Sequence, residues 1–218
     1  CSTCQGVMAQ ANERLCNDEE YRNSINEDLK EEGLAYQGTI EPKHLLWIIV
    51  EDLGIEVLES KLVKQLNGLK LAPFYGCYIV RPSKALGLKD NPGRDKALEK
   101  IIEVVGGEVV DFPGKTLCCG FPILTINPEN SVNMVANHTI DAKERGADAM
   151  VTPCPLCHLN LDGYQPNAAS SRKREINLPI IHLPQLVGLA LGIDPKEMRL
   201  NKHIVSTKKL LSEIAVSP

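Results

Sequence analysis

The run Leu-Lys-Leu-Ala-Pro-Phe-Tyr-Gly-Cys at residues 69–77 decides the fold of this chain. It is a short apolar stretch that ends in a glycine and a cysteine, and it predicts a strand over residues 69–74. From this point on, short apolar runs alternate with longer amphipathic segments. That alternation is typical of strands joined by crossover helices around a parallel sheet, so we expect an α/β fold.

The same patterns predict the other elements. Further strands are expected over residues 108–111 and 149–152 and at Ile180 and Ile181, with helices over residues 96–105, 132–145 and 183–191. The stretch before residue 67 is more polar and predicts helices over residues 5–15, 21–29, 44–53 and 56–66. The expected fold is therefore a Rossmann-like parallel sheet flanked by helices, with an N-terminal helical segment.

Composition narrows the class of protein. The chain has 218 residues, 43% of them hydrophobic, which is enough for a sizeable core. Its net charge is -4, from 24 Lys+Arg and 28 Asp+Glu, and the sequence contains no block of basic residues. We therefore expect no nucleic-acid partner. No apolar run reaches the roughly 18 residues that cross a bilayer, so we expect no transmembrane segment. The expected location is cytoplasmic, with any membrane contact made through partner subunits.

The 8 cysteines are the main functional signal. Without a secretory signal, such a count favours metal binding or redox chemistry over a disulfide scaffold. Five of them follow predicted strands at once or within a few residues, at Cys77, at Cys118-Cys119-Gly120 and at Cys154-Pro155-Leu156-Cys157. Loops beyond the carboxyl ends of parallel strands converge on one crevice, so we expect these five thiols to form a single site.

The type of metal follows less directly from the cysteines. Thiolates suit both iron-sulfur clusters and zinc. The adjacent pair Cys118 and Cys119 favours a cluster, because neighbouring side chains seldom reach one ion without strain. Five sulfurs exceed the four of a cubane or a zinc tetrahedron, so either one is a bystander or the cluster is unusual. In an isolated or air-exposed chain, zinc, or disulfides such as Cys154 to Cys157, can take the place of a lost cluster.

These segments resemble the cysteine-rich CCG domain family, to which the B-type subunits of heterodisulfide reductase belong. The likeness runs from Leu69 to about Val205, and its matching segments are Tyr75-Gly76-Cys77, Cys118-Cys119-Gly120-Phe121-Pro122, the run from Cys154 to Asp162 and the run from His182 to Gly192. It implies that Cys77, Cys118, Cys119, Cys154 and Cys157 together hold a noncubane 4Fe-4S cluster. It also implies two similar halves, each with one cluster, and a disulfide substrate split between them.

The resemblance further implies how the chain is divided. Residues 1–66 would be the helical remainder of the first CCG half, and residues 67–218 the C-terminal CCG domain. Cys1 and Cys4 look like the closing CxxC of the first motif, whose other cysteines would lie upstream, so we expect the chain to be N-terminally incomplete. Cys16 matches no position of the motif.

The function implied is that of an iron-sulfur oxidoreductase subunit resembling the B-type subunit of heterodisulfide reductase, which transfers electrons and reduces a small disulfide. No flavin or nicotinamide motif is evident, so electrons would come from partner subunits, either an electron donor or flavin and iron-sulfur subunits. Two alternatives stay open. One is an electron-transfer subunit of a succinate dehydrogenase or hydroxyacid oxidase complex, and the other is a zinc-stabilised subunit-interaction module.

Several further side chains are candidates for supporting roles. His158 would donate a hydrogen bond to a cluster sulfur or cap a turn, and Gly120 would let the backbone approach the cluster. His44 and His182 are expected in the core, whereas His138 and His203 are expected in solvent. A basic set is expected to be solvated or to attract an anionic substrate, and it comprises Arg81, Lys84 and residues 172–174.

Overall fold

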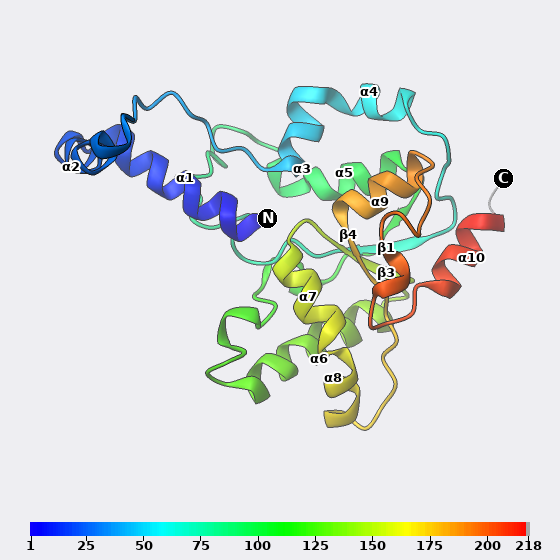
Figure 1. Cartoon of the computed structure of the whole chain (residues 1–218). Coiled ribbons are helices and arrows are strands. Elements are labelled where there is room, and N and C mark those ends of the chain that lie inside the picture. Colours follow the sequence, from blue (N-terminus) through cyan, green and yellow to red (C-terminus); the bar gives the residue numbers. More distant parts are fainter. Residues whose placement is uncertain (217–218) are drawn as a thin grey trace.

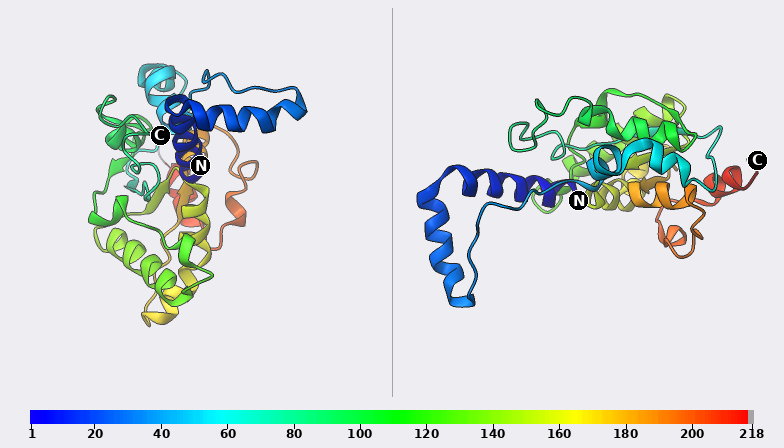
Figure 2. Two further views of the ribbon diagram at one scale, coloured as in Figure 1. Left: turned by 90° about the vertical axis from the view of Figure 1, so that its left-hand side faces the viewer. Right: turned by 90° about the horizontal axis from the view of Figure 1, so that it is seen from above.

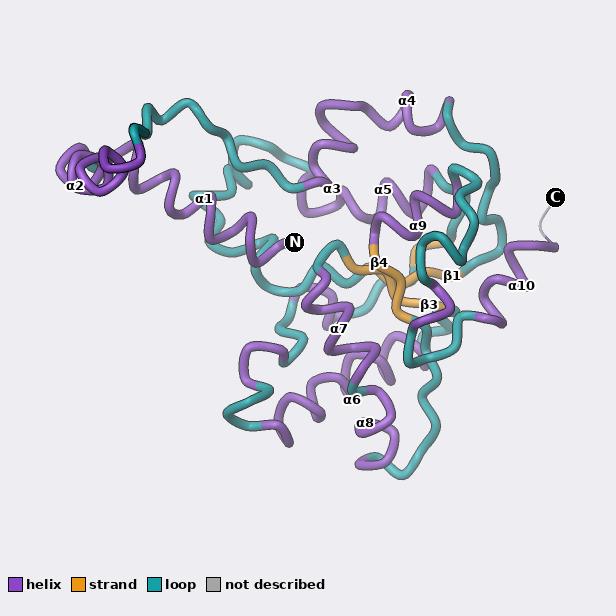
Figure 3. The backbone as a smooth tube through the Cα atoms, in the orientation of Figure 1, coloured by secondary structure: helices purple, strands orange, loops and turns teal. Residues whose placement is uncertain are grey.

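The computed structural model describes residues 1–216 and contains one four-stranded sheet. Its strands are β1 (Lys70–Pro73), β2 (Glu108–Val109), β3 (Ala149–Thr152) and β4 (Ile180–His182), in the order β2-β1-β3-β4. All three pairings are parallel, with Leu71 opposite both Val109 and Ala149, and Val151 opposite Ile181. The predicted α/β fold with a parallel sheet is therefore confirmed (Figures 1 and 3).

Helices cover both faces of the sheet, as side-chain alternation along the strands requires. Leu71 and Val151 belong to a core shared with helices α3 (Leu45–Trp47), α4 (Ile55–Ser60), α5 (Ala97–Val104), α9 (Leu183–Ala190) and α10 (Lys208–Val216). Ala72 and Met150 face the opposite core, which contains α6 (Pro128–Glu144), α7 (Pro155–Gly163) and α8 (Gln165–Ser171). In Figure 1, α3, α4, α5 and α9 lie above the strands, α6, α7 and α8 lie below them, and α10 lies at the right.

The N-terminal segment forms an arm of two helices, α1 (Ser2–Asn17) and α2 (Glu19–Leu29). Figure 2 shows the arm extending from the body of the molecule, with the beginning of α1 against the body and α2 at its far end. Burial agrees with this view, because Ser2, Gln5, Gly6 and Ala9 are buried while α2 has no buried residue. The predicted N-terminal helices are confirmed, and the buried residues of α1 all lie in its first two turns.

Some helix boundaries differ from the sequence prediction. The α6 helix begins at Pro128, before the predicted residue 132, because the Asn127 side chain accepts a hydrogen bond from the amide of Asn130 and caps it. The helix predicted over residues 56–66 ends at Ser60. A π-helical segment, Ile48–Gly54, joins α3 to α4. Helices α7 and α8 were not predicted, because each carries a proline in its first turn.

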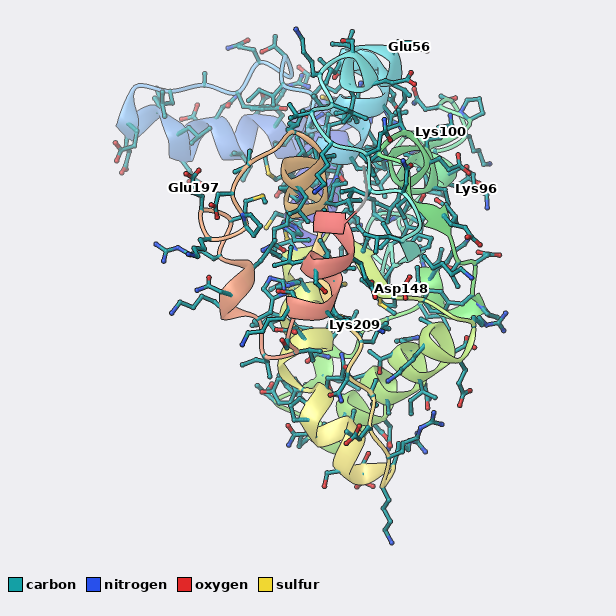
Figure 4. The ribbon with its side chains drawn as sticks, turned by 90° about the vertical axis from the view of Figure 1, so that its right-hand side faces the viewer. Glu56, Lys96, Lys100, Asp148, Glu197 and Lys209 are labelled. Atoms are coloured by element: carbon teal, nitrogen blue, oxygen red, sulfur yellow. The ribbon has the colours of Figure 1, made fainter. Side chains whose placement is uncertain are left out.

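Charged side chains of both signs lie on the outer surface of the molecule. Figure 4 shows the side chains of Glu56, Lys100 and Glu197 projecting away from the ribbon, and all three are exposed. Within residues 1–216, no helix combines the length and the apolar character that a membrane crossing needs.

Candidate metal centre

The five predicted cysteines come together beyond the carboxyl end of the sheet. Cys77 lies in the loop after β1, and Cys154 directly precedes α7, two residues after the end of β3. A cavity of about 210 Å³ is lined by Cys77, Cys119, Cys154 and Cys157. Its other wall residues are largely apolar or aromatic, and include Tyr75, Tyr78, Phe121, Pro122 and Leu156.

Direct interactions connect the five thiols. The Cys77 thiol interacts with the Cys118 thiol, and the Cys157 thiol interacts with those of both Cys119 and Cys154. Cys119 is also close enough to Cys77 for their charges to repel. All five cysteines are free rather than disulfide-bonded. The structure thus gathers in one place the thiols that the sequence places on three separate loops.

Hydrogen bonding gives these thiols different acidities. The Cys157 thiol hydrogen-bonds Cys154 and lowers the pKa of Cys154 to about 5, with help from the backbone amides at the start of α7. The same thiol lowers the pKa of Cys119 by hydrogen bonding. The pKa of Cys157 is itself raised, because it faces both of these groups. Burial raises the pKa of Cys77. At neutral pH the site therefore offers Cys154 as a thiolate, the form that binds metals.

Backbone groups approach the sulfurs closely. The Gly120 amide donates to Cys118 Sγ at 3.4 Å and the Phe121 amide donates to Cys119 Sγ at 3.5 Å. Gly76 has φ +70°, and a Cβ there would lie 2.8 Å from Cys157 Sγ. The missing side chain of Gly120 faces Ser131 on α6 instead. Gly76 is thus the glycine that lets the main chain pass close to a thiol, whereas Gly120 contributes its amide.

Two of the five histidines lie where the sequence did not predict them. His138 was expected in solvent, but it is buried and its Nε2 lies 2.9 Å from the carbonyl oxygen of Cys118. His203, also expected in solvent, is half-buried with its ring 4.7 Å from that of His158. Both expectations were wrong because each residue packs on an element that is distant in sequence. His44 is buried as predicted, and His182 is largely enclosed.

His158 faces away from the thiols. Its Nε2 lies 3.1 Å from the carbonyl oxygen of Ile180, and its ring contacts those of His182 and His203. His158, Asp162 and His203 place one ligand atom each within 4.8 Å of one another. The Asp162 carboxylate accepts the amides of residues 204 and 205 at 2.7 and 3.0 Å, so this group fastens the C-terminal segment to α7.

The remaining cysteines differ in their relation to the cavity. Cys1 packs against the core that contains Cys119, Cys154 and Cys157, and the amide of Thr3 hydrogen-bonds the Cys154 thiol. Cys4 is exposed. Cys16 is exposed on the arm and donates to Asn12 Oδ1 at 3.6 Å. The beginning of α1 therefore reaches the cavity, where Ser2 and Thr3 line its wall, while Cys16 lies apart from it.

The basic residues are mostly engaged with protein groups. Arg81 donates to the Thr116 carbonyl, Lys84 pairs with Glu13, Arg172 donates to Asn137 and Arg174 pairs with Glu144.

The donor set fits a group larger than one ion. A zinc–thiolate bond is about 2.3 Å long, so the sulfurs of a zinc tetrahedron lie roughly 3.8 Å apart. Within the described chain, three Cys, His, Asp or Glu ligand atoms lie within 4.8 Å of one another only at His158, Asp162 and His203. Among the described residues, no three of the five cysteine sulfurs are all within this distance of one another. This spacing suits a cluster with several irons better than a single zinc ion.

Comparison with known proteins agrees with this chemistry. A model of the CCG cysteine-rich domain matches residues 71–162, which include all five cysteines. The 8-methylmenaquinol:fumarate reductase membrane anchor subunit of Wolinella succinogenes is 38% identical over 96% of this chain and 72% of its own length. The B-type subunit of the ferredoxin/F420H2-dependent CoB-CoM heterodisulfide reductase of Methanosarcina acetivorans is 32% identical over 98% of this chain and 71% of its own. The chain belongs to the CCG cysteine-rich domain family.

The fold of this CCG protein also occurs in a solved structure. A hypothetical protein from Helicobacter pylori superposes with a TM-score of 0.66 at 20% identity, over 90% of this chain and 35% of the other, which supports the fold alone. The relatives of this CCG protein are reductase subunits, which supports an oxidoreductase subunit with an iron-sulfur site. They are named as parts of larger complexes, which supports the predicted need for partner subunits.

Proposed function

We propose that this chain is the subunit of a multi-subunit reductase in which Cys77, Cys118, Cys119, Cys154 and Cys157 hold a noncubane 4Fe-4S cluster that reduces a disulfide. The observation that carries the proposal is the convergence of five free thiols from three loops: four of them line one cavity of about 210 Å³, and the fifth, Cys118, interacts with Cys77 at its edge. A cluster bound there would supply single electrons and an iron site for a substrate sulfur.

The residues of the chain prepare this cavity in two ways. The low pKa of Cys154 supplies a thiolate ligand at neutral pH, so binding there does not require removing a proton from that residue. The aromatic and apolar wall, which includes Tyr78, Phe121 and Leu156, limits the access of water. Where water is scarce the effective dielectric constant is low, so protein groups interact more strongly with a charge inside the cavity.

Residues 1–66 are proposed to belong to a first CCG half, and residues 67–218 to the second. The start of α1 supports this division, because Cys1 packs beside the cavity and the Thr3 amide contacts Cys154. A first cysteine set that includes Cys1 and Cys4 would then lie next to the second set. That arrangement would let one substrate disulfide reach both sites.

A second candidate function is electron transfer with a quinol or with fumarate. The supporting observations are the apolar lining of the cavity, which would also accept an apolar ring, and the 38% identity to the menaquinol:fumarate reductase subunit. In that case the chain would pass electrons without acting on a disulfide of its own.

Metal analysis separates the iron proposals from a zinc-stabilised interaction module. We expect anaerobically prepared protein to contain about four irons and as many labile sulfides per chain. A Cys16→Ser variant should match it, since Cys16 lies away from the cavity. Stoichiometric zinc in place of iron and sulfide would refute the proposal.

Turnover by the purified complex separates the two reductase functions. We expect reduced complex to be reoxidised by an organic disulfide, with two thiols formed per two electrons. Reoxidation by fumarate or a quinone, with no response to disulfides, would instead establish the second candidate.

A further inference from the structure

The adjacent cysteines 118 and 119 send their side chains to different neighbours. The Cys118 thiol interacts with Cys77, whereas the Cys119 thiol interacts with Cys157. Successive side chains in an irregular loop have no regular spacing to keep them apart. The contacts that hold the backbone at this pair therefore matter for the directions of its two thiols.

Two buried side chains hold the carbonyl groups of this pair. His138 on α6 places Nε2 2.9 Å from the Cys118 carbonyl oxygen, and Asn160 on α7 donates from Nδ2 to the Cys119 carbonyl oxygen at 2.7 Å. A carbonyl only accepts, so His138 carries its hydrogen on Nε2. His138 is 6% exposed and Asn160 0% exposed, so water cannot replace either donor easily.

These two hydrogen bonds restrain the peptide groups on either side of Cys119. Each peptide group is planar, so a hydrogen bond to its oxygen limits the rotation of the whole group. The Cys118 oxygen belongs to the group before the Cα of Cys119, and the Cys119 oxygen belongs to the group after it. His138 and Asn160 together therefore restrain both backbone dihedrals at Cys119, and with them the direction of its Cβ.

The other side of the loop is fastened as well. The Gly120 amide binds Cys118 Sγ, and a Cβ at Gly120 would lie 2.9 Å from the Ser131 carbonyl oxygen. Asn160 Nδ2 also lies 3.3 Å from Ser131 Oγ, so the loop, α6 and α7 meet at one point. Burial lowers the pKa of His138, which keeps its ring uncharged beside the Phe74 ring at 5.1 Å.

We propose that His138 and Asn160 are positioning residues that restrain the backbone of the Cys118-Cys119 pair by holding its carbonyl groups, and thereby orient the two thiols, most directly that of Cys119. This inference rests on the proposed function for its purpose, the binding of a cluster that uses both adjacent sulfurs. Both side chains bond to carbonyl oxygens rather than to sulfurs, so they act on the thiols through the backbone.

The test compares donor-removing and donor-keeping variants. His138→Phe and Asn160→Leu replace each donor with an apolar side chain of similar size. His138→Gln instead keeps an N–H donor. The controls are Thr139→Val and Gln165→Leu. Thr139 is buried on the same helix and its hydroxyl bonds only within α6, while Gln165 is a buried amide that bonds to residues 161 and 178.

The first measurement needs no metal. The alkylation rate of each cysteine is followed by mass spectrometry in the full chain, reduced and free of metal. We expect Cys118 and Cys119 to react about tenfold faster in His138→Phe and Asn160→Leu, as the loss of a buried hydrogen bond implies. His138→Gln should restore the rate, and both controls should match the parent protein.

The second measurement uses the iron-loaded chain. We expect the two donor-removing variants to change the electron paramagnetic resonance spectrum and the reduction potential of the cluster, and His138→Gln to resemble the parent. Unchanged alkylation rates and an unchanged spectrum would overturn the inference, as would equal changes in the controls. If the parent chain binds no iron, the proposed function fails while the alkylation rates still decide the inference. Each donor is tested separately, so one variant that does not fold leaves the other to decide.

Discussion

Replacing Gly76 with alanine tests whether the main chain must approach the thiols closely. Gly76 has φ +70°, and an added Cβ would lie 2.8 Å from Cys157 Sγ, closer than real side chains come to such an atom. Cys157 cannot yield freely, because it is 6% exposed and contacts both Cys119 and Cys154. We therefore expect Gly76→Ala to displace Cys157 as well as to strain the backbone.

The matched control is Gly68→Ala. Gly68 has φ +83° with nothing within 4 Å of its added Cβ, so it carries the same kind of backbone strain without the contact. The left-handed conformation costs alanine about 1–2 kcal/mol, partly offset by about 0.4–1 kcal/mol from the stiffer unfolded chain. Gly68→Ala should therefore lose about 1 kcal/mol. Overpacking adds about 1–3 kcal/mol, so Gly76→Ala should lose about 2–4 kcal/mol.

Urea unfolding of the reduced, metal-free variants measures these free energies, and iron content after anaerobic loading measures the site. Gly76→Ala should bind much less iron than Gly68→Ala, which should load like the parent chain. Equal stability and equal iron content in the two variants would show that the placement of Gly76 against Cys157 is wrong.

Four further outcomes are expected. Burial lowers the pKa of His44 to about 3, so between pH 6.5 and 3 the unfolded chain binds a proton that the folded chain excludes. His44 should then contribute about 2 kcal/mol to the fall in unfolding free energy from pH 7 to pH 5, and His44→Asn should reduce the slope by that amount; an unchanged slope would contradict the burial of His44. Thiolate absorbance at 240 nm in the metal-free chain should disappear with a midpoint near pH 5, a component that Cys154→Ser must lack if the assignment to Cys154 is right. Tyr75→Phe removes the hydroxyl that donates to Glu99 and accepts the Leu98 amide, so urea unfolding should report a loss of about 1–3 kcal/mol, and an unmoved midpoint would count against this buried contact. Cys16→Ser should leave stability within about 0.5 kcal/mol of the parent value, because Cys16 is exposed, and a larger loss would mean that the arm packs differently.

The sheet could be predicted from sequence because its strands are short apolar runs with clear boundaries. Strand β3 was predicted at residues 149–152, where the structure has Ala149–Thr152. All four of its residues are buried, and such a run is distinct from the amphipathic helix before it. Helix α7 was missed because Pro155 suggested a loop, although proline is favoured at the first position of a helix.

The sequence predicted the cysteines of the candidate site but not the residues that hold their backbone. A cysteine is a candidate ligand by residue type alone, whereas His138 and Asn160 act through contacts that form only in the folded chain. Their helical spacing carried a signal, since Ser131, Val135, His138 and Ala142 form one buried face of α6. Asn160 likewise lies three residues after buried Cys157 on α7. The helical spacing predicts that His138 and Asn160 are buried, but it does not predict which carbonyl oxygen each side chain hydrogen-bonds.

The most direct test of a shared five-cysteine centre is a crystal structure of anaerobically prepared protein with anomalous data collected at the iron edge. We expect iron density inside the cavity of about 210 Å³, bonded by Cys77, Cys118, Cys119, Cys154 and Cys157. A single zinc ion in that cavity, or iron bound elsewhere with these five thiols left free, would contradict the assignment.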